Sequence, residues 1–314
     1  MTIRRLAFIC IILTYFLIVF GGYVASSESG MGCGPEWPLC NGKVFPTLRG
    51  ETLIEFLHRG IGAILGIMSL ILFIKLMRRK IGYTARFVSV MMLGLLIIQV
   101  LLGAVVVVLD LPPIIITIHL LTAMLFMACL IWIWRYSETE GQSAMKPLKA
   151  KEHRKVIMHL NILLFLLFLT LAFGAYIKHE TYGLACGWLD CKQSFLPAAV
   201  PELLQSIHRG LAVISAVHIL LLTYLSYSKG WGRSLRRRLM FCTLMVVLQM
   251  IIGAVVIKTF VAVPWAVFHL AIATALFTIV SEARVYAGAQ IMQWMSYRAG
   301  DRKWNEEEHE RRSF

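Results

Sequence analysis

Charged residues are scarce in this chain: they make up 15% of its 314 residues, against 59% hydrophobic residues. A water-soluble fold of this composition would leave too much apolar surface exposed, which excludes the soluble protein classes. Acidic residues are the rarer charged group, with 17 Asp and Glu against 31 Lys and Arg. In a soluble protein this excess of positive charge would suggest a nucleic-acid partner. In a membrane protein it indicates orientation instead, and we expect no nucleic-acid partner.

Eight apolar runs are long enough to cross a bilayer, and each must be a helix because backbone exposed to lipid has no other way to satisfy its polar groups. The sequence therefore predicts an all-α polytopic membrane protein. The first run shows no clean small-residue cleavage site, so we interpret it as a retained span rather than a removed signal peptide. The predicted spans cover residues 6–25, 53–76, 87–109, 114–134, 156–177, 203–227, 239–257 and 262–280.

The Lys and Arg residues fall mainly on one side of these spans. Both termini and the loops after the second, fourth and sixth spans hold 24 of the 31. By the positive-inside rule this side is cytoplasmic. We expect a multi-pass protein of the cell membrane with both termini in the cytoplasm.

Four of the seven cysteines form two spaced pairs in the loops assigned to the outer side, Cys33 with Cys40 and Cys186 with Cys191. Outside the cytoplasm such pairs indicate disulfides. A zinc site is the alternative, but neither loop offers two further ligands at suitable spacing. The other three cysteines lie within spans and are interpreted as small packing residues.

The chain contains an internal repeat of a four-helix unit. Because each unit has an even number of spans, both copies enter the membrane in the same direction, and we expect a pseudo-twofold axis along the membrane normal. This divides the chain into a first half (1–135), a cytoplasmic linker (136–155), a second half (156–290) and a cytoplasmic tail (291–314). The matched segments are 21–24 with 174–177, Cys33 with Cys186, 55–60 with 205–210, 99–106 with 249–256, and His119 with His269.

Four of the nine histidines occupy repeat-related positions within the second and fourth spans of each half: His58, His119, His208 and His269. Ionisable residues inside spans are costly and indicate function. All four lie at one depth, roughly 8–10 Å below the outer surface at about 1.5 Å per residue. Two imidazoles from facing helices are suited to hold a haem between them, whereas bare zinc or copper would lack ligands. The alternative for a single buried histidine is a hydrogen-bonded packing role. The other five, without this pattern, are predicted to be structural or solvated: His153, His159, His179, His218 and His309.

Two charged residues accompany the histidines. Arg59 and Arg209 directly follow His58 and His208, and such guanidinium groups either pair with haem propionates or reach the lipid headgroups. Glu55 lies one turn before His58, where the second half has Gln205. A carboxylate can exchange protons and an amide cannot, so we predict an acid-base role for Glu55. The alternative is that Glu55 caps the start of its helix.

Taken together, these residues resemble the haem A synthase family, in its bacterial form with cysteine pairs in the outer loops. The resemblance covers nearly the whole chain, including the segment CGPEWPLC at 33–40. It implies an enzyme that oxidises the C8 methyl of haem O to a formyl group, by two successive hydroxylations and loss of water, to give haem A. It also implies that His58 and His119 flank the substrate haem, with Glu55 as the catalytic group.

The resemblance further implies that His208 and His269 bind a permanent haem b that passes electrons, and that a haem O synthase delivers the substrate. Two other interpretations are compatible with the residues alone. One is a membrane cytochrome b that only relays electrons, and the other is a transporter for haem or another small molecule.

Overall fold

The computed structural model describes residues 1–139, 150–187, 191 and 199–312. Eight long α-helices cross its length, and each is long and apolar enough to span a membrane, as predicted. Two 3₁₀ turns, η1 (Ser29–Met31) and η2 (Tyr182–Leu184), follow α1 and α5. The helices are α1 (Ile3–Ser26), α2 (Gly50–Met77), α3 (Tyr83–Val108), α4 (Pro113–Thr139), α5 (Ala150–His179), α6 (Val200–Ser228), α7 (Arg233–Lys258) and α8 (Val263–Arg312).

The helix ends depart most from the prediction on the side that carries the basic loops. There α5 starts at Ala150 rather than at residue 156, and α8 continues to Arg312 instead of ending near residue 280. Hydropathy marks where a span leaves the membrane. It does not mark where the backbone stops being helical, because polar residues such as Glu, Arg, Lys and Gln are themselves good helix formers.

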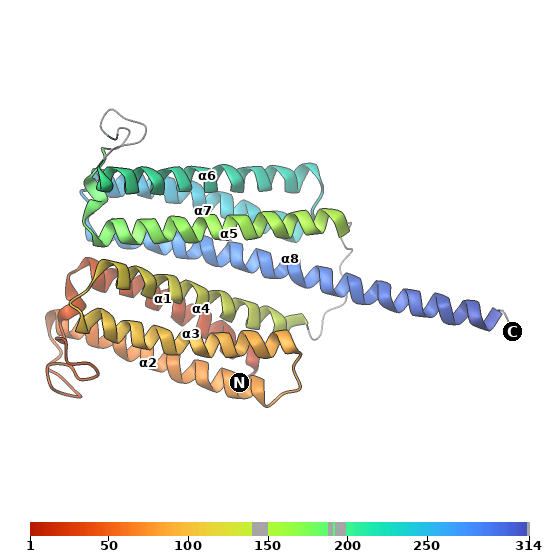
Figure 1. Ribbon diagram of the computed structural model, residues 1–314, viewed down its shortest axis with the longest axis horizontal. Coiled ribbons are helices and arrows are strands. Elements are labelled where there is room, and N and C mark those ends of the chain that lie inside the picture. Colours follow the sequence, from red (N-terminus) through yellow and green to blue (C-terminus); the bar gives the residue numbers. More distant parts are fainter. Residues whose placement is uncertain (140–149, 188–190, 192–198, 313–314) are drawn as a thin grey trace.

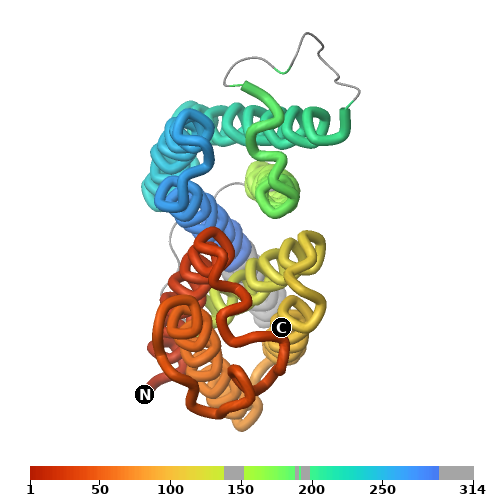
Figure 2. The backbone as a smooth tube through the Cα atoms, turned by 90° about the vertical axis from the view of Figure 1, so that its left-hand side faces the viewer, coloured from red at the N-terminus to blue at the C-terminus, as the bar shows by residue number. Residues whose placement is uncertain are grey.

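The helices form two four-helix groups that lie side by side, with α1–α4 in one and α5–α8 in the other (Figures 1 and 2). The inner helices α1, α4, α5 and α8 pack across the boundary between the halves, which we call the seam. The contact of α1 with α8 has its counterpart in that of α5 with α4. This matching agrees with the predicted repeat, while the pseudo-twofold axis stays a prediction.

Small residues and polar bonds bring the halves together at the seam. A Cβ atom on Gly22 of α1 would lie 2.3 Å from Leu270 Cδ2 of α8, so the close approach of these helices depends on glycine. About two turns away on α1, the Tyr15 hydroxyl donates to the Ala271 carbonyl at 3.2 Å. Fully buried apolar side chains fill the rest of the seam and both half-bundles, among them Leu6, Met124, Leu130, Leu163 and Val280. Cys10, Cys129 and Cys242 are buried free thiols, as expected of packing residues.

Substitution Gly22→Leu should destabilise the protein, because the added side chain overlaps Leu270 where α1 and α8 touch. We expect a loss of about 1–3 kcal/mol, measured as a lower thermal unfolding midpoint in detergent. Gly94→Leu is the matched control, since nothing lies within 4 Å of a Cβ atom at that position. Equal effects of the two substitutions would contradict the seam contact.

Candidate functional site

Both predicted cysteine pairs are disulfides in the structure. Cys33–Cys40 lies in the segment between α1 and α2, and Cys186–Cys191 lies between α5 and α6. Residues 188–190 and 192–198 of the second loop lie outside the described part of the chain. Within the described part, no group of three or more His, Cys, Asp and Glu side chains is arranged to hold a metal ion, so the zinc alternative gains no support there.

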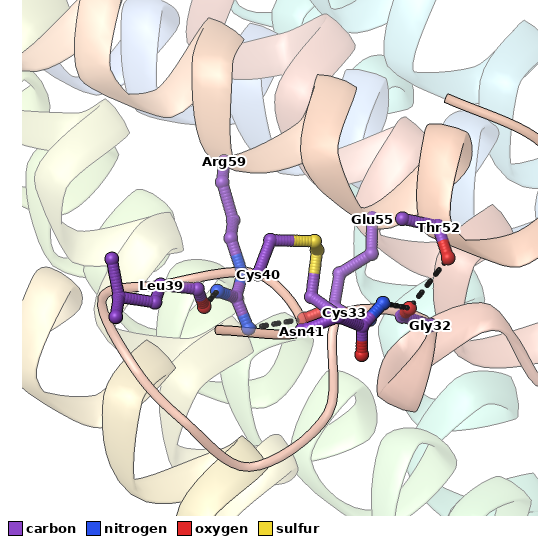
Figure 3. The surroundings of a disulfide bond; sticks show 8 residues. All are labelled: Gly32, Cys33, Leu39, Cys40, Asn41, Thr52, Glu55 and Arg59. Atoms are coloured by element: carbon purple, nitrogen blue, oxygen red, sulfur yellow. Dashed lines mark hydrogen bonds and ion pairs between the residues drawn. A yellow bond between two sulfur atoms is a disulfide. The ribbon is translucent and has the colours of Figure 1, made fainter. Parts of the chain in front are cut away.

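The first disulfide loop is tied to α2 through Glu55, whose side chain is buried with 3% of its surface exposed. One carboxylate oxygen accepts a hydrogen bond from the Cys33 backbone N–H at 2.8 Å. The other accepts from the Arg59 guanidinium at 2.5 Å, and Arg59 also donates to the Leu39 carbonyl at 3.0 Å. Figure 3 shows Glu55 and Arg59 extending from α2 toward the loop that carries the disulfide. The carboxylate is therefore held in place from the loop and from its own helix.

The same loop lies directly against the start of α2. The Gly32 carbonyl accepts hydrogen bonds from Asn41 Nδ2 at 3.1 Å and from Thr52 Oγ1 at 2.7 Å (Figure 3). A Cβ atom on Gly32 would lie 2.4 Å from the Glu51 carbonyl carbon. Glu51, and not Glu55, is the acidic residue in the first turn of α2. The alternative that Glu55 caps the helix start is therefore wrong.

The second half repeats this arrangement with a neutral side chain. Gln205 Oε1 accepts from the Cys186 backbone N–H at 2.7 Å, as Glu55 does from Cys33. Gln205 Nε2 donates to the Gly183 carbonyl at 2.8 Å, a bond that a carboxylate cannot make. Arg209 donates to the Gly187 carbonyl at 2.8 Å, as Arg59 does to Leu39. Both arginines thus hold a loop carbonyl, and propionate binding by either stays a prediction.

Each of the four predicted histidines packs against a glycine on a neighbouring helix of its own half. The closest approach is at Gly174 of α5, where a Cβ atom would lie 2.8 Å from His208 Cε1. The corresponding distances are 3.0 Å from Gly21 to His58, 3.3 Å from Gly103 to His119 and 3.2 Å from Gly253 to His269.

Hydrogen bonds place the lone pair of three of these histidines on Nε2. The Gln99 amide lies 3.1 Å from His119 Nε2, and the Gln249 amide lies 3.1 Å from His269 Nε2. An amide nitrogen only donates, so Nε2 is the acceptor in both cases. These two glutamines occupy matched positions of the repeat, but the sequence pattern indicated no role for them.

The third of these bonds distinguishes the halves: His208 Nδ1 donates to the Thr170 carbonyl at 2.9 Å, which leaves Nε2 as a ligand. His58 Nδ1 is buried, and no residue of the described part of the chain forms a hydrogen bond with it. The ring of His208 is thus fixed by a backbone acceptor, and that of His58 is not.

A cavity of about 950 Å³ lies in the second half and reaches across the seam. His208, His269 and Gln249 line it from the second half, and Gly22 and Ala25 of α1 line it from the first. Its size falls in the range of cofactor pockets.

Two further cavity residues were not predicted as site residues. Lys178 donates from Nζ to the Ala25 carbonyl at 3.0 Å, and so links α5 to α1 at the rim of the cavity. His179 also lines the cavity, although sequence analysis grouped it with the structural or solvated histidines. The available signal for Lys178 was a cation at the outer end of a span where the first half has Ala25.

Comparison with known proteins identifies the family to which the chain belongs. Residues 4–52 and 47–281 match the family model described as cytochrome oxidase assembly protein. The chain belongs to this family. It is 30% identical over 289 residues to a haem A synthase of Shouchella clausii, covering 88% of this chain and 94% of the relative. It is 29% identical over 292 residues to a haem A synthase of Staphylococcus epidermidis, covering 89% and 93%. A haem A synthase of Bacillus licheniformis is 30% identical over 217 residues, covering 68% and 71%.

Membership of this family implies that haem is involved, and the residues of the second half fit a haem. His208 and His269 line one cavity, and each carries its lone pair on Nε2. That of His208 could bind iron directly, whereas that of His269 accepts from the Gln249 amide, a bond that iron binding would have to replace. Lys178 and Arg209 line the same cavity and supply positive charge suited to carboxylates.

Substitution Gly174→Ala should lower the amount of haem bound, because the added methyl group would push the His208 ring off the Thr170 carbonyl. Loss of such an orienting bond typically costs about 10–100-fold in affinity. Haem per polypeptide in the purified protein is the measurement. Gly66→Ala is the control and should leave the haem content unchanged, since no described atom lies within 4 Å of a Cβ atom at Gly66.

Proposed function

We propose that this protein is a haem A synthase, an integral membrane oxidoreductase that converts haem O to haem A by oxidising the C8 methyl group to a formyl group. The observation that supports this proposal most directly is the chemical difference between Glu55 and Gln205, which occupy matched positions of the repeat. Both are buried on the second helix of their half, and both accept the N–H of a disulfide cysteine, at 2.8 Å and 2.7 Å. Only Glu55 can take up or release a proton.

We assign the substrate site to the first half, residues 1–135, with His58 and His119 on either side of haem O. His58 lacks a hydrogen bond at Nδ1, which suits a ligand that must accept and release a substrate. We assign a haem b to the second half, residues 156–290, with His208 and His269 as its axial ligands. The bond from His208 to the Thr170 carbonyl supports permanent binding, since such bonds fix ring orientation. The chemistry that haem b supplies is one-electron transfer.

The side chains around Glu55 have a positioning role in this proposal. The Cys33 N–H and the Arg59 guanidinium fix both carboxylate oxygens, so Glu55 can exchange a proton without moving its side chain. The loop between the cysteines lies over Glu55 and limits access of water to it. In the second half, Arg209 and Lys178 would hold the haem b propionates at the cavity they line.

We infer that the haem sites lie toward the outer side of the cell membrane and that both termini are cytoplasmic. The distribution of Lys and Arg supports this orientation, and so does the presence of both disulfides at the opposite end. Because haem O is the substrate, a haem O synthase in the same membrane is the natural supplier.

Expression in a host that makes haem O but not haem A tests the proposal directly. The extracted pigments are separated by chromatography and identified by mass spectrometry. Formyl haem that appears only with this chain supports the synthase. Haem b without formyl haem would favour the electron-relay cytochrome instead. If no haem were found, the transporter would be the remaining interpretation.

Substitution Glu55→Gln should reduce haem A formation by roughly 10²-fold or more, the scale of general acid-base catalysis. The amide can still accept the Cys33 N–H, as Gln205 accepts that of Cys186. Folding and haem b content should therefore be retained. Haem A formation at the normal rate would show that Glu55 has no acid-base role.

His208→Ala and His58→Ala together test which half holds the cofactor. We expect His208→Ala to remove most of the haem b from the purified protein, because an axial ligand is lost. His58→Ala should keep haem b and lose haem A formation. Reduced-minus-oxidised spectra report haem b, and unaltered spectra in His208→Ala would overturn the assignment of the halves.

A further inference from the structure

A second cavity, of about 310 Å³, opens between α4, α7 and α8 at the end of the molecule opposite the disulfides. Arg135 of α4 comes from the first half, while Arg237 and Arg238 of α7 and Glu282 of α8 come from the second. The cavity therefore crosses the seam, and its lining carries two more positive than negative charges.

Two of the arginines are held rigidly around the single carboxylate. Arg238 donates to both oxygens of Glu282, at 2.6 Å and 2.9 Å, and Arg135 forms an ion pair with the same group. The Arg238 guanidinium also lies 3.9 Å from the centre of the Tyr286 ring, and that of Arg135 lies 4.7 Å from the Trp134 ring. Guanidinium groups stacked and paired in this way are preorganised for an anion with several oxygen atoms.

The depth of these charges matches the headgroup layer of a bilayer. Arg237 and Arg238 are the fifth and sixth residues of the α7 span, which begins at Arg233. At about 1.5 Å per residue they lie roughly 6–8 Å inside the end of the helix. Phe241, one turn deeper on the same face as Arg237, also lines the cavity and is 52% exposed. The site is thus cationic at headgroup depth and apolar just below it.

The repeat shows that this cluster is not a remnant of the ancestral four-helix unit. At the matching positions the first half has Trp132 for Glu282, Val88 for Arg238 and Phe87 for Arg237. Arg135 is matched by Val285 in the second half. The charges exist only where α4 of one half meets α7 and α8 of the other.

We propose that this cavity binds the phosphodiester headgroup of an anionic phospholipid, with an acyl chain along Phe241. Basic pockets between transmembrane helices bind such headgroups. The bound lipid would link the two halves at the end of the seam opposite Lys178 and Ala25. This inference does not depend on the proposed enzymatic function.

The test is native mass spectrometry of the full-length protein in detergent, with phosphatidylglycerol and phosphatidylcholine of identical acyl chains added in turn. We expect the wild-type protein to retain phosphatidylglycerol and not phosphatidylcholine. Arg237→Gln should weaken phosphatidylglycerol retention by about tenfold, since a charge-assisted bond is lost. Equal retention of the two lipids would overturn the proposal.

Arg236→Gln is the matched control, because it removes the same charge from the adjacent residue. Arg236 lies over the Tyr227 ring, 4.4 Å from its centre, and does not line the cavity. Equal loss of lipid in both variants would show that binding reflects general surface charge, and would overturn the site. Competition by inorganic phosphate separates the two sources of the headgroup chemistry. Displacement of the lipid by millimolar phosphate would make this a site for the free anion, against the proposal.

Discussion

The hydrogen bond from a disulfide cysteine N–H to a buried side chain of the following helix is the interaction on which the outer end of both halves depends. Glu55 and Gln205 would be costly to bury without partners, and the loop N–H groups of Cys33 and Cys186 supply them. In return, the side chain fixes the loop over its own half-bundle. In the first half, the disulfide joins Cys33, which donates this bond, to Cys40 at the other end of the loop. Loop, helix and site thus depend on one another.

The two halves share this geometry but differ in what it permits chemically. Both ends of the Gln205 amide are hydrogen-bonded, because its oxygen accepts from the Cys186 N–H and its nitrogen donates to the Gly183 carbonyl. Glu55 instead pairs with the Arg59 cation, and its carboxylate is the group that we propose exchanges protons near His58. The histidines follow the same division, since His208 is anchored to a backbone carbonyl and His58 is not. In the proposed function, one copy keeps a cofactor and the other works on a substrate.

Contacts at the seam join the two copies of the four-helix repeat into one structure. Close packing at Gly22 and the bond from Lys178 to the Ala25 carbonyl bring α1 and α4 to the wall of the second-half cavity. The cavity wall therefore includes helices of both halves, and a cofactor in it would lie against the half to which we assign the substrate. At the other end, the Arg135 and Glu282 ion pair closes the same seam. Both ends of the seam thus depend on polar contacts that the first half and the second half supply jointly.

Much of this protein is determined by its sequence, because the bilayer leaves few choices. Long apolar runs must be helices, and paired cysteines outside the cytoplasm indicate disulfides, so the eight spans and the two disulfides were predictable. Haem binding by the four histidines stays a prediction. Helix ends were not, since polar residues extend α5 and α8 beyond the membrane. Side-chain partners were not predictable either. These contacts depend on how the loops fold back and how the halves pack. Examples are the bond from Arg59 to the Leu39 carbonyl, that between Gln99 and His119, and that from Lys178 to Ala25, its counterpart in the repeat. Periodicity describes the faces of single helices. Only the tertiary structure decides which faces and loops meet.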